Sequence, residues 1–231
     1  SNVNTYLLRL FKEIFKNYPK LNGIHFDYIR FQDDFYGFNN YGLNDFQNKY
    51  NFNPKDIFRD IFSNRYGWTN SEIDSIKNIR INYNCDNITS LIRSINSYRD
   101  SLGLDILISA AVKSDIVEAK NRWFQDWGKW IEEDIIDFVI PMNYSSDNDI
   151  FIQRINMISE NLDSSFSKDK IIMGISMYNQ DEYSIVEKIL LSTISGYNQI
   201  CFFSYNSLKE RNINFKLIKN SYNKRKYLLG E

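Results

Sequence analysis

Short apolar runs alternate with longer amphipathic stretches along most of the 231-residue chain. This rhythm is typical of α/β proteins, in which crossover helices join parallel strands. The run at 106–112 contains too few polar residues for an exposed strand, as expected of a sheet covered by helices. The apolar runs predict five strands, at 23–31, 106–112, 137–144, 171–178 and 199–205.

Amphipathic stretches predict one helix before the first strand and helices after each strand. Residues 4–17 place their apolar side chains on one helical face, and Pro19 closes that helix. Asn53 and Pro54 form an N-cap and first-turn pair for a later helix. The predicted helices cover residues 4–17, 54–65, 70–80, 86–102, 118–133, 148–161, 182–194 and 213–222.

Five βα units fit two architectures. A closed (β/α)8 TIM barrel has eight strands, so five units would form a partial barrel. An open doubly wound sheet is the alternative, but the Gly-rich turn usual after its first strand is absent. The acidic residues Asp33 and Asp34 stand near that position instead and would repel a phosphate. The sequence therefore favours an α/β barrel of TIM type, and the lack of a Ser/Gly/Pro-rich linker predicts a single domain over residues 1–231.

Composition narrows the functional classes. Hydrophobic residues make up 43% of the chain and charged residues 25%, which is typical of a globular protein. A net charge of −1 gives no reason to expect nucleic acid or an anionic membrane surface as a partner. Cys85 and Cys201, the only cysteines, form neither a disulfide framework nor a zinc-binding pattern. No metal site, membrane span or signal peptide is predicted.

Aromatic residues are unusually numerous, with 17 Phe, 16 Tyr and 4 Trp. Codon usage in an AT-rich genome explains many of them without any function. The functional interpretation is that some form stacking platforms for sugar rings, because a flat apolar face with polar edges suits such ligands.

The segment GIHFDYIRF (23–31) contains the leading candidate for chemistry. Side chains alternate along a strand, so His25 and Asp27 share one face, while Ile24 and Phe26 share the other. Ile24 and Phe26 suit the helix-covered side, which leaves the first pair in the barrel lumen. Asp27 then lies near the carboxyl end of its strand, where barrel enzymes place catalytic residues. A structural Asp27 that caps a loop or pairs with Arg30 is the alternative. His25 is expected to be a core residue or to orient Asp27.

The segment RWFQDWGKWIEEDIIDFVIPMNY (122–144) contains the second group of candidates. Its three tryptophans fall at helical spacing, which is typical of a core face. Asp126 could reach a sugar if the start of this helix faces the barrel mouth. Asn143 and Tyr144 end the strand, where an amide and a phenol could bind sugar hydroxyls. Asp137 begins the same strand, at the bottom of a barrel, and is expected to be structural.

Together these two segments resemble the glycosyl hydrolase-like 10 family. The strands within 108–112, 174–178 and 202–205 follow in the order that the family shows. Its members are bacterial TIM-barrel proteins, usually exported or lipid-anchored, similar to enzymes that cut cell-wall or related glycans. The resemblance places Asp27 at the end of barrel strand 4, so that the five strands correspond to strands 4 to 8 and strands 1 to 3 are not in this sequence. The family commonly has Pro where this chain has Gln32.

The resemblance implies a glycoside hydrolase that acts on a polymeric, bacterial cell-wall or extracellular glycan without a cofactor. Such enzymes use two carboxylates, about 5–5.5 Å apart for retention and about 6.5–9.5 Å apart for inversion. Asp27 is expected to be one of them, with Asp115 or Asp126 as the best partners and Asp33 and Asp34 behind them. The residues expected to bind the oligo- or polysaccharide are His25, Tyr28, Arg30, Asn143, Tyr144, Tyr178 and Tyr205.

Two other functions remain open at this point. A non-catalytic carbohydrate-binding or scaffold protein could keep the barrel without a carboxylate pair. An open-sheet α/β enzyme unrelated to glycans would place its ligand at a topological switch point, and the order of the strands in space distinguishes it from a barrel.

Overall fold

A computed structural model describes residues 2–57, 66–163 and 165–228. Its five strands are parallel, and each pairs with the next along the chain, in the order β1-β2-β3-β4-β5. A doubly wound sheet would reverse its strand order at a switch point, so the sequential order rules out that alternative. The strands are β1 (Gly23–Phe26), β2 (Leu107–Lys113), β3 (Phe138–Met142), β4 (Met173–Ser176) and β5 (Ile200–Phe203).

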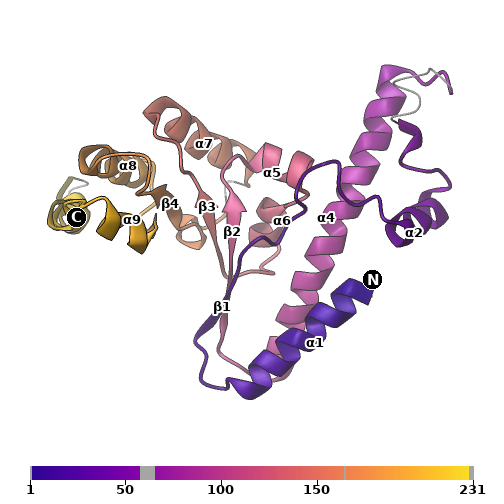
Figure 1. The fold of residues 1–231 in the computed structure, drawn as a ribbon, viewed down its shortest axis with the longest axis horizontal. Coiled ribbons are helices and arrows are strands. Elements are labelled where there is room, and N and C mark those ends of the chain that lie inside the picture. The colour runs from indigo at the N-terminus through magenta and orange to yellow at the C-terminus, as the bar shows by residue number, and fades with distance from the viewer. Residues whose placement is uncertain (1, 58–65, 164, 229–231) are drawn as a thin grey trace.

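The sheet forms half of a barrel, with helices along its outer side (Figure 1). This confirms the predicted α/β architecture as a partial TIM barrel. No helix within the described ranges is long and apolar enough to cross a membrane. The helices are α1 (Asn2–Asn17), α2 (Asn40–Tyr50), α4 (Asn70–Ser101), α5 (Ile116–Trp123), α6 (Trp127–Glu132), α7 (Asn148–Asn161), α8 (Glu182–Ile194), α9 (Tyr205–Glu210) and α10 (Phe215–Lys224), with 3-10 turns η1 (Lys168–Lys170) and η2 (Arg225–Leu228).

The first strand is shorter than the predicted 23–31, because the backbone turns immediately after Asp27. The Asp27 carboxylate accepts a hydrogen bond from the Tyr28 N–H at 2.9 Å. Tyr28 itself adopts a left-handed backbone conformation with a φ of 55°, which residues other than glycine rarely adopt. The strand therefore ends at Phe26, and the residues after Asp27 form a loop.

The predicted helices at 70–80 and 86–102 are one continuous helix, α4. A capping box begins it, because Thr69 and Glu72 each accept a hydrogen bond from the other's backbone N–H. Neither glycine nor proline occurs between 80 and 86, so nothing interrupts the helix there. The first part of α4 extends beyond the sheet, with α2 beside it (Figure 1).

Helix α2 was not predicted from the sequence, since its short apolar stripe is weak. It is held against α4 by an edge-to-face contact between Phe46 and Tyr83 (centroids 5.1 Å apart) and by a hydrogen bond from the Tyr83 hydroxyl to Asp45 (2.6 Å). Most of the helix predicted at 54–65 falls on residues 58–65, outside the described ranges.

The helix predicted at 118–133 is two helices, α5 and α6, separated by a turn. Phe124 adopts a left-handed conformation there (φ 52°) and is fully buried. Gln125, also fully buried, accepts a hydrogen bond from the Lys113 N–H at 2.8 Å. Its amide nitrogen lies 3.4 Å from the Ile29 carbonyl oxygen. The break therefore lets a side-chain amide join β2 to the loop after β1.

The core lies between the sheet and the helices. Phe26 and alternate residues of β2 point toward the helices and are buried, as the period-2 pattern predicts. Trp127 and Trp130 are fully buried in this core, as expected from their helical spacing. At the contact between β3 and β4 a Cβ on Gly174 would lie 2.6 Å from the Pro141 carbonyl oxygen, so the close approach of these strands requires glycine.

Asp137 joins three elements at the bottom of the sheet. One oxygen of its carboxylate accepts hydrogen bonds from Arg99 at the end of α4 (2.8 Å) and from the backbone N–H of Ile108 in β2 (2.6 Å). Asp137 itself directly precedes β3. This agrees with the structural role expected from its place in the sequence.

We predict that Asp137→Ala lowers the free energy of unfolding by about 2 kcal/mol, because it leaves a strand N–H and a guanidinium without their acceptor. Urea unfolding followed by circular dichroism measures the change. Asp100→Ala is the matched control, because Asp100 pairs with the same Arg99 at the exposed surface (3.0 Å). Asp100→Ala should lower the free energy of unfolding by about 0.5 kcal/mol or less. Equal losses in the two variants would contradict the structural role of Asp137.

Candidate active site

His25 and Asp27 lie on the concave side of the half-barrel. Phe26, between them, packs against Phe11 of α1 with ring centroids 5.3 Å apart. Because side chains alternate along a strand, its two neighbours point away from the helices. Both are exposed. The structure thus places Asp27 at the carboxyl end of β1, on the face that the alternation predicts.

His25 is held by the adjacent strand. Its Nδ1 lies 2.9 Å from the Ser109 hydroxyl, directly across the β1–β2 pair. The Ser109 hydroxyl lies 3.4 Å from the Ile24 carbonyl oxygen, so it can donate there and accept the Nδ1 proton of His25. Desolvation lowers the pKa of His25 below its ordinary value, and the charge of Asp27 partly opposes this shift. A neutral imidazole at pH 7 follows, with Nε2 free to accept a proton.

Three aromatic rings gather at the carboxyl ends of β3, β4 and β5. The rings of Tyr144 and Phe203 are stacked, with centroids 5.4 Å apart and an interplanar angle of 13°. Tyr178 meets both edge-on, at 6.2 and 6.4 Å. Tyr178 and Phe203 remain about half exposed, at 47% and 51%. We refer to Tyr144, Tyr178 and Phe203 as the aromatic cluster, an arrangement that can stack on a sugar ring.

Asp27 and the aromatic cluster lie at the same rim. Burial raises the pKa of Tyr144 well above its ordinary value, and the neighbouring Cys201, Tyr178 and Asp27 raise it further. The charge of Asp27 therefore acts on the phenol of Tyr144 across the concave side. Since β2 lies between β1 and β3 in the sheet, a saccharide that contacts both the cluster and Asp27 would extend across the end of β2.

A hollow of about 370 Å³ adjoins this rim at the ends of β2 and β3. Tyr144, Lys113 and Asp115 all line it. Asp115 also caps α5, since its carboxylate accepts a hydrogen bond from the Glu118 N–H at 2.8 Å. Desolvation lowers the pKa of Lys113, and the charge of Arg30 lowers it further. The structure thus brings Asp115 to the same rim as Tyr144, with one carboxylate oxygen used in the cap.

The structure does not bring Asp126 to Asp27. Asp126 precedes α6 in the helical layer, where its carboxylate lies 3.0 Å from the ammonium of Lys120. It lines a separate hollow between helices. The start of α6 faces the outer layer because Trp127, the next residue, is buried against the sheet. The sequence-based expectation that Asp126 reaches the barrel mouth is therefore corrected.

Asn143 is also placed away from the concave side. It precedes Tyr144 and so points to the opposite face, where its side chain is 1% exposed. Its amide donates to the Phe151 carbonyl at 2.9 Å and accepts from Arg154 at 3.4 Å. The amide expected to bind sugar instead connects β3 to α7.

Tyr205, another expected sugar-binding residue, is the first residue of α9 and is 78% exposed. Phe203, two residues earlier and at the end of β5, contributes its ring to the aromatic cluster instead. Sequence reasoning missed Phe203, Ser109 and Lys113. The alternation along the strands predicted at 106–112 and 199–205 was the signal that could have indicated Ser109 and Phe203.

The loop after β1 carries the remaining predicted residues. The guanidinium of Arg30 stacks on the ring of Tyr28, 4.5 Å from its centroid. Asp33 forms an ion pair with Arg122 at 2.9 Å, and this hydrogen bond is the main reason that the pKa of Asp33 falls to about 2. Burial, followed by the neighbouring Asp33, raises the pKa of Asp34. The ion pair between Asp33 and Arg122 thus holds the loop against α5.

Two further contacts hold this loop. Arg80 of α4 donates hydrogen bonds to the carbonyl oxygens of Asp34 and Tyr36, the latter at 2.9 Å. The Phe31 N–H donates to the Trp123 carbonyl at 3.0 Å. In the part of the chain that the structure describes, no group of three or more His, Cys, Asp or Glu side chains is arranged to hold a metal ion.

Comparison with known proteins gives the family and the fold of the chain. The family model of glycosyl hydrolase-like 10 matches residues 1–188. No curated protein matches the chain. Among solved structures, the PgaB (BpsB) glycoside hydrolase domain from Bordetella bronchiseptica is similar, with a TM-score of 0.62 and 12% sequence identity. The similarity covers 94% of this chain and 60% of that domain.

At 12% identity the structural match shows the fold, which is that of a partial glycoside hydrolase barrel. The chain spans about 60% of the length of the domain it matches. The family model, by contrast, covers most of the 231 residues. The chain therefore belongs to the glycosyl hydrolase-like 10 family.

Proposed function

We propose that this protein is a glycoside hydrolase that cleaves O-glycosidic bonds at the concave rim, with Asp27 as a catalytic carboxylate. The observation that carries the proposal is that the carboxyl ends of the parallel strands lie along one rim, with Asp27 directly after β1 and the aromatic cluster at the ends of β3, β4 and β5. A sugar ring stacked on the cluster would hold its glycosidic oxygen next to Asp27. Glycosidases require a carboxylate in this position, as nucleophile, general base or general acid.

Asp27 is distinguished from other acids by its position. Among the residues of the five strands and those that directly follow them, all of them described, it is the only carboxylate. The hydrogen bond from the Tyr28 N–H fixes the orientation of its side chain. His25, next to it on the strand, is held by Ser109 and can accept a proton at Nε2. We propose that His25 positions Asp27 electrostatically.

The second carboxylate comes from a loop in this proposal. Asp115 is the best partner, because it lines the hollow that Tyr144 also lines. A separation of about 5–5.5 Å between the two carboxyl groups in the substrate complex would give retention, and about 6.5–9.5 Å inversion. Neither a metal nor an organic cofactor takes part in this chemistry.

We propose a polymeric, bacterial cell-wall or extracellular glycan as the substrate, cleaved outside the cytoplasm. The support is the family resemblance, together with the aromatic rings at the rim, on which sugar rings can stack.

A non-catalytic glycan-binding protein is the second candidate. The observation that favours it is that Asp27 is the only carboxylate directly at the end of a strand, while Asp115 already caps α5 with one oxygen. A lone carboxylate cannot supply both acid and base. Binding of a glycan without release of reducing ends would support this candidate. Release of reducing ends would exclude it.

Asp27→Asn should reduce glycan cleavage by about a hundredfold to ten-thousandfold, since the amide can act neither as nucleophile nor as acid or base. Release of reducing ends from peptidoglycan measures the loss, and circular dichroism confirms the fold. Asp126→Asn is the control, because this acid pairs with Lys120 in the helical layer, and its turnover should stay close to that of the natural chain. Unchanged turnover in Asp27→Asn would refute the assignment.

Phe203→Ala should weaken glycan binding about twofold to tenfold, because a stacking contact contributes about 0.5–1.5 kcal/mol. The effect is expected in KM or Kd more than in kcat. Tyr205→Ala is the matched control, as this aromatic residue lies two positions later and outside the cluster. Greater weakening in Tyr205→Ala than in Phe203→Ala would contradict the role of the aromatic cluster.

A further inference from the structure

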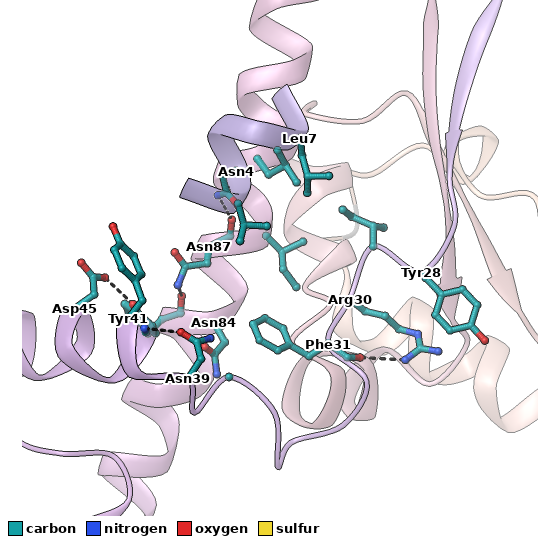
Figure 2. Close-up of a pocket in the computed structure, with 17 residues that line it drawn as sticks. Asn4, Leu7, Tyr28, Arg30, Phe31, Asn39, Tyr41, Asp45, Asn84 and Asn87 are labelled. Carbon is teal, nitrogen blue, oxygen red and sulfur yellow. Dashed lines mark hydrogen bonds between the residues drawn. The ribbon is translucent and has the colours of Figure 1, made fainter. Parts of the chain in front are cut away.

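A second hollow, of about 580 Å³, lies away from the aromatic cluster, between α1, α2, α4 and the loop after β1. Figure 2 shows Tyr28 and Arg30 on one side of it and Asn39, Tyr41 and Asn84 on the other. Its volume is in the range of small-ligand sites, about 300–1,000 Å³. Apolar side chains from α1 and α4 form much of its wall.

One buried amide in this hollow has no partner. Asn84 of α4 is only 4% exposed, yet its side chain forms no hydrogen bond with any residue that the structure describes. The next amide along this helix, Asn87, donates to the Tyr83 carbonyl at 3.0 Å. Neither of its amide atoms is among the fully buried, unpartnered atoms of the described residues, so the amide is reached from the hollow that it lines. The amide of Asn84 therefore offers one acceptor and two donor hydrogens to a bound molecule.

Gly37 keeps this amide uncovered. A Cβ at this position would lie 3.5 Å from the Asn84 Oδ1, 3.6 Å from its Nδ2 and 3.1 Å from the ring of Phe31. Gly37 also has a φ of +93°, which L side chains rarely adopt. A glycine here thus leaves open the space in front of the amide.

The charged groups that line the hollow already have partners. Asp45 accepts the hydroxyl hydrogen of Tyr83 at 2.6 Å. Arg30 donates to the Phe31 carbonyl at 3.0 Å and stacks on Tyr28. The polar groups left for a ligand are neutral, above all the amide of Asn84 and the exposed phenol of Tyr41. A neutral ligand fits this set better than an ion.

We propose that this hollow is a second carbohydrate site, which binds a neutral saccharide unit. The Asn84 amide pairs with sugar hydroxyl or amide groups, and the rings of Phe31 and Tyr41 provide flat apolar faces. Tyr28 directly follows Asp27, and the charge of Arg30 reaches Lys113 at the rim of β2. The loop after β1 therefore connects the hollow to the concave rim. The choice of a saccharide rests on the proposed function.

The experiment uses the Asp27→Asn chain, so that bound sugar is not cleaved. The probes are the neutral hexamers chitohexaose and cellohexaose, with the acidic hexamer of galacturonic acid as comparator. At least one neutral hexamer should bind in calorimetry and shift the side-chain amide resonances of Asn84 in a ¹⁵N spectrum. Asn84→Leu should weaken that binding about tenfold, as expected for the loss of a buried hydrogen-bonding group.

Asn96→Leu is the matched control. Asn96 lies on the same helix, its Oδ1 is buried without a partner, and it does not line the hollow. Its substitution should leave saccharide binding unchanged. If Asn84→Leu folds poorly, the shift of the Asn84 amide resonances in the chain that keeps Asn84 still shows whether a saccharide binds beside this residue.

Three results would overturn the proposal: no binding of either neutral hexamer, binding that Asn84→Leu leaves unchanged, or stronger binding of the acidic hexamer. Loss of catalysis is tested separately at Asp27. Cleavage that persists in Asp27→Asn refutes the catalytic assignment and leaves the Asn84 comparison valid. A tenfold loss confined to Asn84→Leu supports the second site even if no glycan is cleaved.

Discussion

The packing of Phe26 against Phe11 is the contact on which the rest of the candidate site depends. It fixes which face of β1 is covered by helices, and the alternation of side chains then directs His25 and Asp27 to the concave side. Each following strand joins the sheet beside the previous one, so the carboxyl ends of all five lie along one rim. Residues far apart in sequence, such as Asp27 and Tyr144, are brought together by this order alone.

Contacts from other elements hold the loop after β1 in place. Its backbone begins in a left-handed conformation at Tyr28, which costs about 1–3 kcal/mol and needs compensation from its surroundings. Gln125 and Arg80 supply this compensation from two directions, through backbone carbonyls of the loop. The guanidinium of Arg80 also lies over the rings of Phe38 and Phe124, at 4.3 and 5.0 Å. Its burial lowers the pKa of Arg80 to about 10, so the side chain stays charged at neutral pH.

The loop after β1 lies beside both candidate binding regions. The loop has Asp27 at its start and lines the hollow at Asn84 further on, so one rigid segment contacts both candidate binding regions. Rigid support matters in such sites, because a displaced carboxylate or amide loses most of its effect on a bound sugar. Membership in the glycosyl hydrolase-like 10 family and the half-barrel fold agree with this description. The comparisons show the family and the fold. The chemistry proposed at the rim rests instead on the particular residues found there.

Local patterns in the sequence determined the alternation of strands and helices, the face of β1 that carries Asp27, and the burial of Trp127 and Trp130. These depend on periods of two and 3.6 residues, which the chain displays without reference to distant parts. Tertiary structure decided the rest. Asp126 pairs with Lys120 in the helical layer, a contact between elements that spacing does not indicate. Asn143 donates to Phe151 on the face opposite to Tyr144, as strand alternation requires once the face of Tyr144 is known. The break at Phe124, the aromatic cluster and the free amide of Asn84 arise from contacts between separate elements, for which spacing along the chain gives no signal.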